Sequence, residues 1–169
     1  MNVFGFAGFS GSGKTRLIEQ LIPVFVKTGL RVSLVKHAHH DFDLDVPGKD
    51  SWRHRQAGCT EVMVSSSARW AIMHELRGDQ EPGLDEQLRH MSPVDLVLVE
   101  GFKREPIPKL EIWRPEVGKP LLYPEDTHII AIASTQSLDC LLPQFDLDDP
   151  YAIAGFIMRY FGFMESAYA

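Results

Sequence analysis

Short apolar runs alternate with segments of helical periodicity, most clearly in the first forty residues. Residues 2–7 form an apolar run rich in aromatic and β-branched side chains, which predicts a buried strand. Residues 16–28 carry apolar side chains at the spacing of a helix packed on a sheet, and Gly29 favours a helix end there. Residues 31–36 predict a second strand. This order predicts a βαβ unit with a right-handed crossover.

The rest of the chain continues this alternation. Five further apolar runs predict strands at 61–65, 69–74, 95–100, 109–113 and 129–133. Three segments predict helices at 50–57, 84–91 and 150–160. The pattern predicts an α/β fold with a mostly parallel sheet flanked by helices and one β-hairpin outside it. We expect a single domain over residues 1–169, with about 61–74 and 103–125 as β-rich excursions from its core.

Three details of the predicted helices follow from single residues. Pro23 lies inside the first helix and should bend or split it, because proline lacks the amide hydrogen that the helix needs. Asp50 or Ser51 is expected to cap the second helix at its N-terminus. Asp148 or Asp149 is expected to do the same for the last helix.

Residues 8–15 read Gly-Phe-Ser-Gly-Ser-Gly-Lys-Thr. Glycines at this spacing allow backbone amides to converge on phosphate oxygens, and the following helix adds its positive N-terminal end. Lys14 should reach the β- and γ-phosphates, and the Thr15 hydroxyl should bind Mg²⁺. Between a predicted strand and a predicted helix, this motif predicts a P-loop NTPase fold. A glycine-rich turn without a ligand is the weaker alternative.

A carboxylate follows the most continuous apolar run of the chain. Glu100 ends the sequence Asp-Leu-Val-Leu-Val-Glu, at the carboxyl end of a predicted strand, where α/β proteins bind their ligands. We expect Glu100 to hold Mg²⁺ together with Thr15, directly or through water. The alternative is a strand that simply ends in a charged residue.

A dense group of histidines and aspartates follows the second predicted strand: His37, His39, His40, Asp41, Asp43 and Asp45. Three interpretations remain open. The group could bind a transition metal, since imidazole and carboxylate are ligands. It could be a solvated polar loop. It could also sense the γ-phosphate or bind a second substrate, because the strand before it leads toward the P-loop.

The segment after this group carries further candidates. Asp50 is a candidate catalytic residue that would orient the attacking water or a substrate hydroxyl. Arg53 and Arg55 could grip a phosphate in bidentate fashion, and an ordinary charged helix face is the equal alternative.

Composition and charge narrow the class of protein. The 169 residues are 44% hydrophobic and 24% charged, as in an ordinary globular protein. The formal net charge of −6 argues against nucleic acid as the main partner. We find no membrane span and no signal peptide, and the two cysteines, Cys59 and Cys140, lack metal-type spacing. We therefore expect a reduced, cytoplasmic location.

Taken together, these motifs resemble the MobB family, the molybdopterin-guanine dinucleotide biosynthesis adaptor proteins. The resemblance covers nearly the whole chain. It is carried by residues 8–15, 35–40, 48–51, 53–58, 98–103 and 109–112.

This resemblance implies a GTP-binding adaptor with weak GTPase activity, using GTP and Mg²⁺. It implies a homodimer built partly by the strand-rich excursions. The family is also similar to small P-loop GTPases of the signal-recognition type. The resemblance further implies that the protein assists the guanylyltransferase that joins GMP to molybdopterin, with other cofactor-maturation proteins as partners and molybdopterin as a candidate ligand. The nucleotide contacts that it implies are Gly8, which opens the loop, then Ser10, Gly11, Ser12, Gly13, Lys14 and Thr15.

The sequence leaves two other functions open. A P-loop kinase for a small molecule would use Asp50 as its base and the histidine loop for its acceptor. A binding module switched by nucleotide would need no significant turnover. The Asn-Lys-x-Asp motif that reads guanine in better-known GTPases is absent, so the preference for guanine rests on the resemblance.

Overall fold

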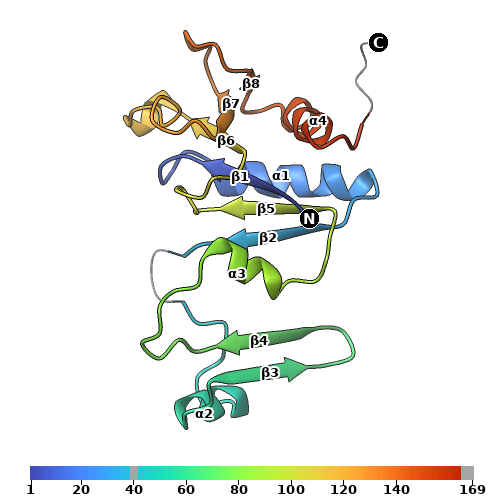
Figure 1. The fold of residues 1–169 in the computed structure, drawn as a ribbon, viewed down its shortest axis with the longest axis vertical. Coiled ribbons are helices and arrows are strands. Elements are labelled where there is room, and N and C mark those ends of the chain that lie inside the picture. The colour runs from blue at the N-terminus through green and yellow to red at the C-terminus, as the bar shows by residue number, and fades with distance from the viewer. Residues whose placement is uncertain (39–41, 165–169) are drawn as a thin grey trace. The chain divides into compact units, whose positions relative to one another are not determined.

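The computed structural model describes residues 1–38 and 42–164. The chain forms two compact units, one of residues 1–37 and 92–169 and one of residues 38–91 (Figure 1). The first unit contains the main sheet, and the second contains a β-hairpin with two short helices.

Six strands form the sheet of the first unit, in the order β2-β5-β1-β6-β7-β8. They are β1 (Asn2–Ala7), β2 (Val32–Lys36), β5 (Leu96–Glu100), β6 (Lys109–Trp113), β7 (Ile129–Ser134) and β8 (Gln144–Asp146). Every pairing in this sheet is parallel, so the carboxyl ends of all six strands meet at one edge. All five residues of β5 are buried, which explains its continuous apolar run.

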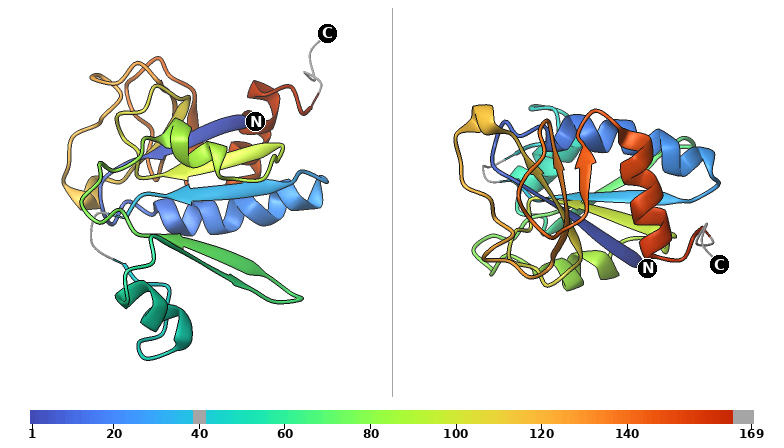
Figure 2. Two further views of the ribbon diagram at one scale, coloured as in Figure 1. Left: turned by 60° about the horizontal axis from the view of Figure 1, so that its bottom comes forward. Right: turned by 90° about the horizontal axis from the view of Figure 1, so that it is seen from above.

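Two α-helices pack on this sheet, α1 (Lys14–Lys27) and α4 (Pro150–Tyr160), and a short 3₁₀ helix, η1 (Pro115–Val117), follows β6. Both helices bury one apolar face in a common core with the strands, and α1 runs alongside β2 and β5 (Figure 2). The Asp149 side chain accepts a hydrogen bond from the Ala152 amide at 3.0 Å, which confirms the predicted cap of α4.

The first unit differs from the sequence-based expectation in three places. Helix α1 is not split at Pro23, since the buried residues Leu21 and Phe25 hold the helix to the core on both sides. Strand β6, expected within an excursion, lies inside the sheet between β1 and β7. Strand β8 was not predicted because three residues are too few to show a period.

The second unit contains α2 (Asp50–Gln56), β3 (Glu61–Ser65), β4 (Trp70–His74) and α3 (Leu84–Arg89). Strands β3 and β4 pair in antiparallel fashion and confirm the predicted hairpin. The predicted cap of α2 is wrong, because Asp50 is already helical and Lys49 takes the cap position without a side-chain hydrogen bond. Asp50 still lies in the first turn, where a negative charge favours the helix.

Candidate nucleotide-binding site

The P-loop lies between the end of β1 and the start of α1, as the motif requires. Gly8 has a φ of 144° and lies so close to β6 that an added Cβ would be 2.5 Å from the Ile112 carbonyl oxygen. The same Cβ would be 2.7 Å from the Ser12 hydroxyl. Only glycine fits this position, and the close approach holds the start of the loop against the neighbouring strand.

The Lys14 side chain folds back over the loop. Its ammonium group donates hydrogen bonds to the carbonyl oxygens of Gly8 and Phe9, each at 2.9 Å. Burial lowers the pKa of Lys14, Glu100 opposes this, and the positive charges of Lys103 and Lys36 add to it. Three lysines that repel one another at one site create the positive potential that an anionic ligand would relieve.

Thr15 and Glu100 meet at the same edge of the sheet. The Thr15 hydroxyl donates a hydrogen bond to Glu100 Oε1 at 3.0 Å. The Lys36 ammonium lies 3.6 Å from Glu100 Oε2. The pairing of β5 between β1 and β2 sets this arrangement, since Glu100 is in register with both Phe6 and Lys36. A hydroxyl and a carboxylate in contact are the oxygen ligands that Mg²⁺ prefers.

Two further features were not predicted from the sequence. The Ser12 hydroxyl is buried and has no hydrogen-bond partner among the described residues. The Lys103 ammonium lies 5.2 Å from the centre of the Phe9 ring, a cation–π distance that places another positive charge beside the loop. Ser10, Gly11 and Thr15 are exposed, so the open side of the loop is accessible to a ligand.

Only His37, Asp43 and Asp45 of the histidine and aspartate group lie within the described residues. His39, His40 and Asp41 lie outside the described residues. The backbone amide of His37 donates to the Glu100 carbonyl oxygen at 2.8 Å, which fixes the backbone of His37 beside this candidate metal ligand. Within residues 1–38 and 42–164, no group of three or more His, Cys, Asp or Glu side chains has the arrangement of a metal site.

Arg55 contacts the two aspartates Asp43 and Asp45 of that group. Its guanidinium donates to both oxygens of Asp43 at 2.8 Å, to Asp45 at 3.2 Å and to Glu75 at 2.6 Å. These carboxylates raise the pKa of Arg55, with Asp43 as the largest cause. The guanidinium is therefore occupied inside the second unit and does not match the predicted phosphate grip.

The other candidates in the second unit are exposed. The side chains of Arg53 and Asp50 are 71% and 92% exposed and lie 4.0 Å apart. An exposed pair at this distance adds little stability. The role of Asp50 in orienting water stays a prediction.

Residues 3–135 match the family model described as "Molybdopterin guanine dinucleotide synthesis protein B". This chain belongs to the MobB family. The expected resemblance is thereby confirmed.

Individual relatives cover nearly the whole chain. The molybdopterin-guanine dinucleotide biosynthesis adapter protein of Escherichia coli is 40% identical over 94% of this chain and 92% of its own length. That of Haemophilus influenzae is 43% identical over 92% of this chain and 86% of its own.

Solved structures of MobB proteins share the fold. The MobB homologue from Bacillus stearothermophilus has a TM-score of 0.72 and 26% identity, covering 97% of this chain and all of its own. The Bacillus subtilis MobB has a TM-score of 0.73 and 25% identity, covering 94% and 97%. The predicted fold class, a P-loop NTPase with a mostly parallel sheet flanked by helices, is confirmed.

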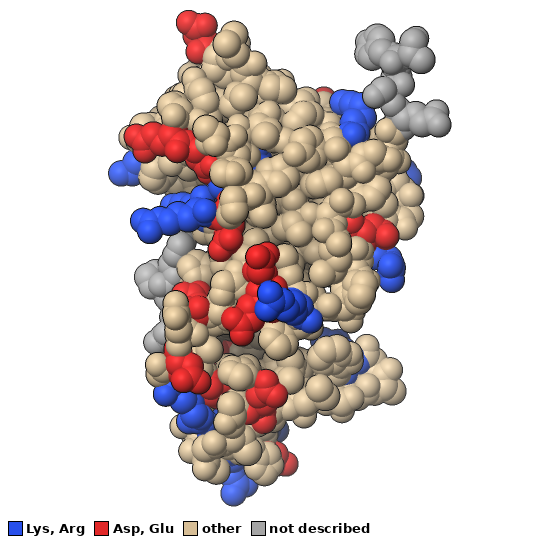
Figure 3. Space-filling view, viewed as in Figure 1, with Lys and Arg blue, Asp and Glu red and all other residues tan. Residues whose placement is uncertain are grey.

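The helices and the surface charge bear on two expectations from the sequence, the absence of a membrane span and the acidic net charge. Within residues 1–38 and 42–164, the helices lack the length and apolar character needed to cross a lipid bilayer. Figure 3 shows lysine and arginine side chains interspersed with aspartate and glutamate on the face that it draws. That mixture agrees with the formal net charge of −6.

Proposed function

We propose that this MobB protein is a GTP-binding adaptor that assists molybdopterin guanine dinucleotide synthesis and hydrolyses GTP slowly. The observation that carries the proposal is the contact between Thr15, in the first turn of α1, and Glu100, at the end of β5. The names of the relatives support the adaptor role.

The residues present fit a nucleoside triphosphate with Mg²⁺. The ammonium of Lys14 donates to two loop carbonyls, and it can exchange these for phosphate oxygens with little movement. The amides of Ser10 to Gly13 would bind phosphate, as the resemblance implies, and the buried Ser12 hydroxyl would gain a partner. Thr15 and Glu100 would hold Mg²⁺, which neutralises phosphate charge when bound.

Slow turnover is part of the proposal. Fast hydrolysis of the phosphoanhydride bond between the β- and γ-phosphates uses a group that orients the attacking water. We assign this role to Asp50, whose side chain is 92% exposed. Because water competes with every contact of an exposed carboxylate, we expect Asp50 to orient water poorly.

The exposed apolar side chains of the hairpin support a homodimer. Met63, Trp70 and Ile72 share one face of the β3–β4 hairpin, since Met63 pairs with Ile72 and Trp70 lies two residues from Ile72, and they are 45–60% exposed. Exposed apolar groups in one place are typical of a protein interface. Light scattering should give a dimer mass at micromolar concentration, and a monomer throughout that range would contradict this part of the proposal.

The test of nucleotide binding uses a panel of nucleotides titrated with and without Mg²⁺, with turnover measured in the same samples. Lys14→Ala should weaken GTP binding by roughly 10- to 150-fold, since hydrogen bonds to charged groups contribute about 1.5–3 kcal/mol. Lys27→Ala removes an exposed lysine at the other end of the same helix and serves as the control. Glu100→Gln should reduce the dependence of binding on Mg²⁺.

Equal GTP binding by Lys14→Ala and the parent protein would refute the proposal. Rapid phosphorylation of an added small-molecule acceptor would instead favour a kinase. The adaptor role is tested separately by titrating the guanylyltransferase that joins GMP to molybdopterin against the parent protein. We expect saturable binding, and its absence in the presence of GTP and Mg²⁺ would contradict that role.

A further inference from the structure

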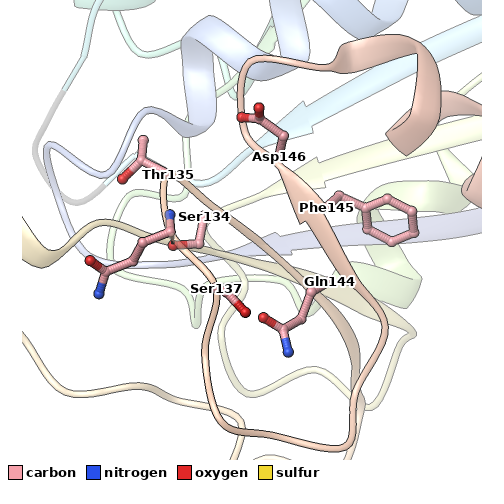
Figure 4. A pocket seen from close by; sticks show the side chains of 7 residues that line it. Ser134, Thr135, Ser137, Gln144, Phe145 and Asp146 are labelled. Atoms are coloured by element: carbon pink, nitrogen blue, oxygen red, sulfur yellow. Dashed lines mark hydrogen bonds between the residues drawn. The ribbon is translucent and has the colours of Figure 1, made fainter.

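A small polar pocket opens at the carboxyl edge of the sheet, away from Glu100. It has a volume of about 280 Å³ and is lined by residues 134–137, which follow β7, and residues 144–146 of β8. Figure 4 shows the Phe145 ring pointing away from Ser134 and Thr135, so the pocket wall is polar on that side. Nothing in the P-loop site described above uses these residues.

The strand order connects this pocket to the P-loop. Strand β6 lies beside β1, and β7 and β8 follow it in the sheet. In the parallel register Trp113 is opposite Ser134, and Ser134 is opposite Asp146. The Arg16 guanidinium also lies 3.7 Å from Asp148, so the first turn of α1 and the segment after β8 are neighbours. P-loop and pocket therefore occupy one continuous edge.

Arg114 lies between them, directly after β6. Its guanidinium packs on Gly13, with Nε and one terminal nitrogen at 3.5 and 3.6 Å from the place of a Cβ on that glycine. Its Nε is buried and has no hydrogen-bond partner among the described residues. A buried donor without a partner is costly, so a ligand that supplies an acceptor there is favoured. A guanidinium can also stack on a planar base.

The hydrogen-bonding groups of the pocket are unequally occupied. The Gln144 amide exchanges two hydrogen bonds at 2.8 Å with the backbone of Leu138. Ser134 Oγ accepts a hydrogen bond from the backbone amide of Gln136 at 3.2 Å. Asp146 Oδ1 accepts from the Asp148 amide at 2.9 Å, whereas no partner of Oδ2 is found within residues 1–38 and 42–164. The ionised carboxylate of Asp146 can accept hydrogen bonds but cannot donate them.

We propose that these residues form the nucleoside subsite: Arg114 contacts the ribose and base next to the P-loop, and Asp146 binds the base edge. Guanine offers two adjacent donors, N1–H and the 2-amino group, which match a carboxylate. Adenine has an acceptor at N1 and is disfavoured. The inference rests on the proposed function, and it supplies a residue-level reason for a guanine preference.

The experiment compares binding of GTP, XTP and inorganic tripolyphosphate, each with Mg²⁺, to the parent protein and three variants. Asp146→Asn should weaken GTP binding at least about tenfold, the loss expected for a hydrogen bond to a charged group. It should also shift the preference toward XTP, since the new amide can donate to the 2-oxo group that replaces the amine. Arg114→Met should weaken GTP binding by a larger factor than it weakens tripolyphosphate binding, because only GTP carries the ribose and base that Arg114 would contact. Asp139→Asn removes the same charge from the loop between β7 and β8, outside the pocket, and should behave as the parent.

Tripolyphosphate has no ribose or base, so its binding tests the P-loop and shows whether each variant is folded. It therefore distinguishes failure of the nucleoside subsite from failure of the P-loop function. If the parent binds tripolyphosphate and GTP equally well, or if Asp146→Asn keeps the parental ratio of GTP to XTP affinity, the nucleoside subsite is refuted while the P-loop function stands. If the parent binds neither ligand, both proposals fail.

Discussion

Replacing Gly8 with alanine tests the close packing that holds the P-loop against β6. The new methyl group would lie 2.5 Å from the Ile112 carbonyl oxygen, which is part of the sheet and cannot rotate away. The second close atom, the Ser12 hydroxyl at 2.7 Å, can move by a change of rotamer. The strain must therefore be taken up by the backbone of the loop or of β6.

Gly11→Ala provides a matched control within the same loop. Gly11 also has a positive φ, of 82°, but nothing lies within 4 Å of its added Cβ. Both variants carry a conformational cost of about 1–2 kcal/mol, which is typical of left-handed backbone. Only Gly8→Ala adds overpacking, for which we take about 2 kcal/mol. For a chain of this length, that difference should lower the Tm by roughly 4–8 °C relative to Gly11→Ala.

The assay is thermal unfolding followed by circular dichroism, without nucleotide, so that ligand binding does not shift the equilibrium. A urea titration with unchanged m-value would confirm that the two variants differ in stability and not in the unfolded state. If both variants melt within a degree of each other, or if Gly11→Ala is the less stable, the loop is not held by contact with β6 and the reasoning is wrong.

Three further substitutions test contacts within the first unit. Lys109→Met removes a fully buried ammonium that lies 2.6 Å from Asp126, and we expect urea denaturation at pH 7 to show a loss of about 3 kcal/mol. Burial raises the pKa of Glu111, so the folded protein holds this proton more tightly than the unfolded chain does. The free energy of unfolding of the parent, relative to that of Glu111→Gln, should therefore fall as the pH rises above 4.5 and level off beyond the raised pKa. Urea titrations at a series of pH values measure this difference. Asp149→Ala removes the cap on the Ala152 amide and should cost about 1 kcal/mol in the same assay.

The strands and the phosphate loop could be predicted because their determinants are local in sequence. Strand β5 is buried along its whole length and its first four side chains are apolar, so the carboxylate of Glu100 that ends it stands out. The P-loop needs glycines and a lysine at fixed spacing, and the structure places Lys14 and Thr15 accordingly. Residues whose roles depend on a contiguous motif are visible in the sequence.

The remaining features depend on contacts between distant residues. Arg114 reaches Gly13 only because β6 is inserted beside β1, and no sequence period reveals strand order. The aspartates Asp43 and Asp45 attracted attention through composition, whereas their role is set by Arg55, at least ten residues away along the chain. Charge density in a sequence indicates that partners are needed, but it does not identify them.

The strand order also explains why one edge of the sheet can serve two chemical tasks. Strand β1 delivers the P-loop from the interior of the sheet, with β5 on one side and β6 on the other. On the β5 side, Glu100 contacts Thr15 and Lys36, the groups suited to metal and phosphate. On the β6 side, Arg114 contacts Gly13 and leads toward the polar pocket after β7. A ligand that carries phosphates at one end and a polar base at the other matches this division. Its phosphates would meet the P-loop and the groups on the β5 side, and its base would meet the side chains on the β6 side.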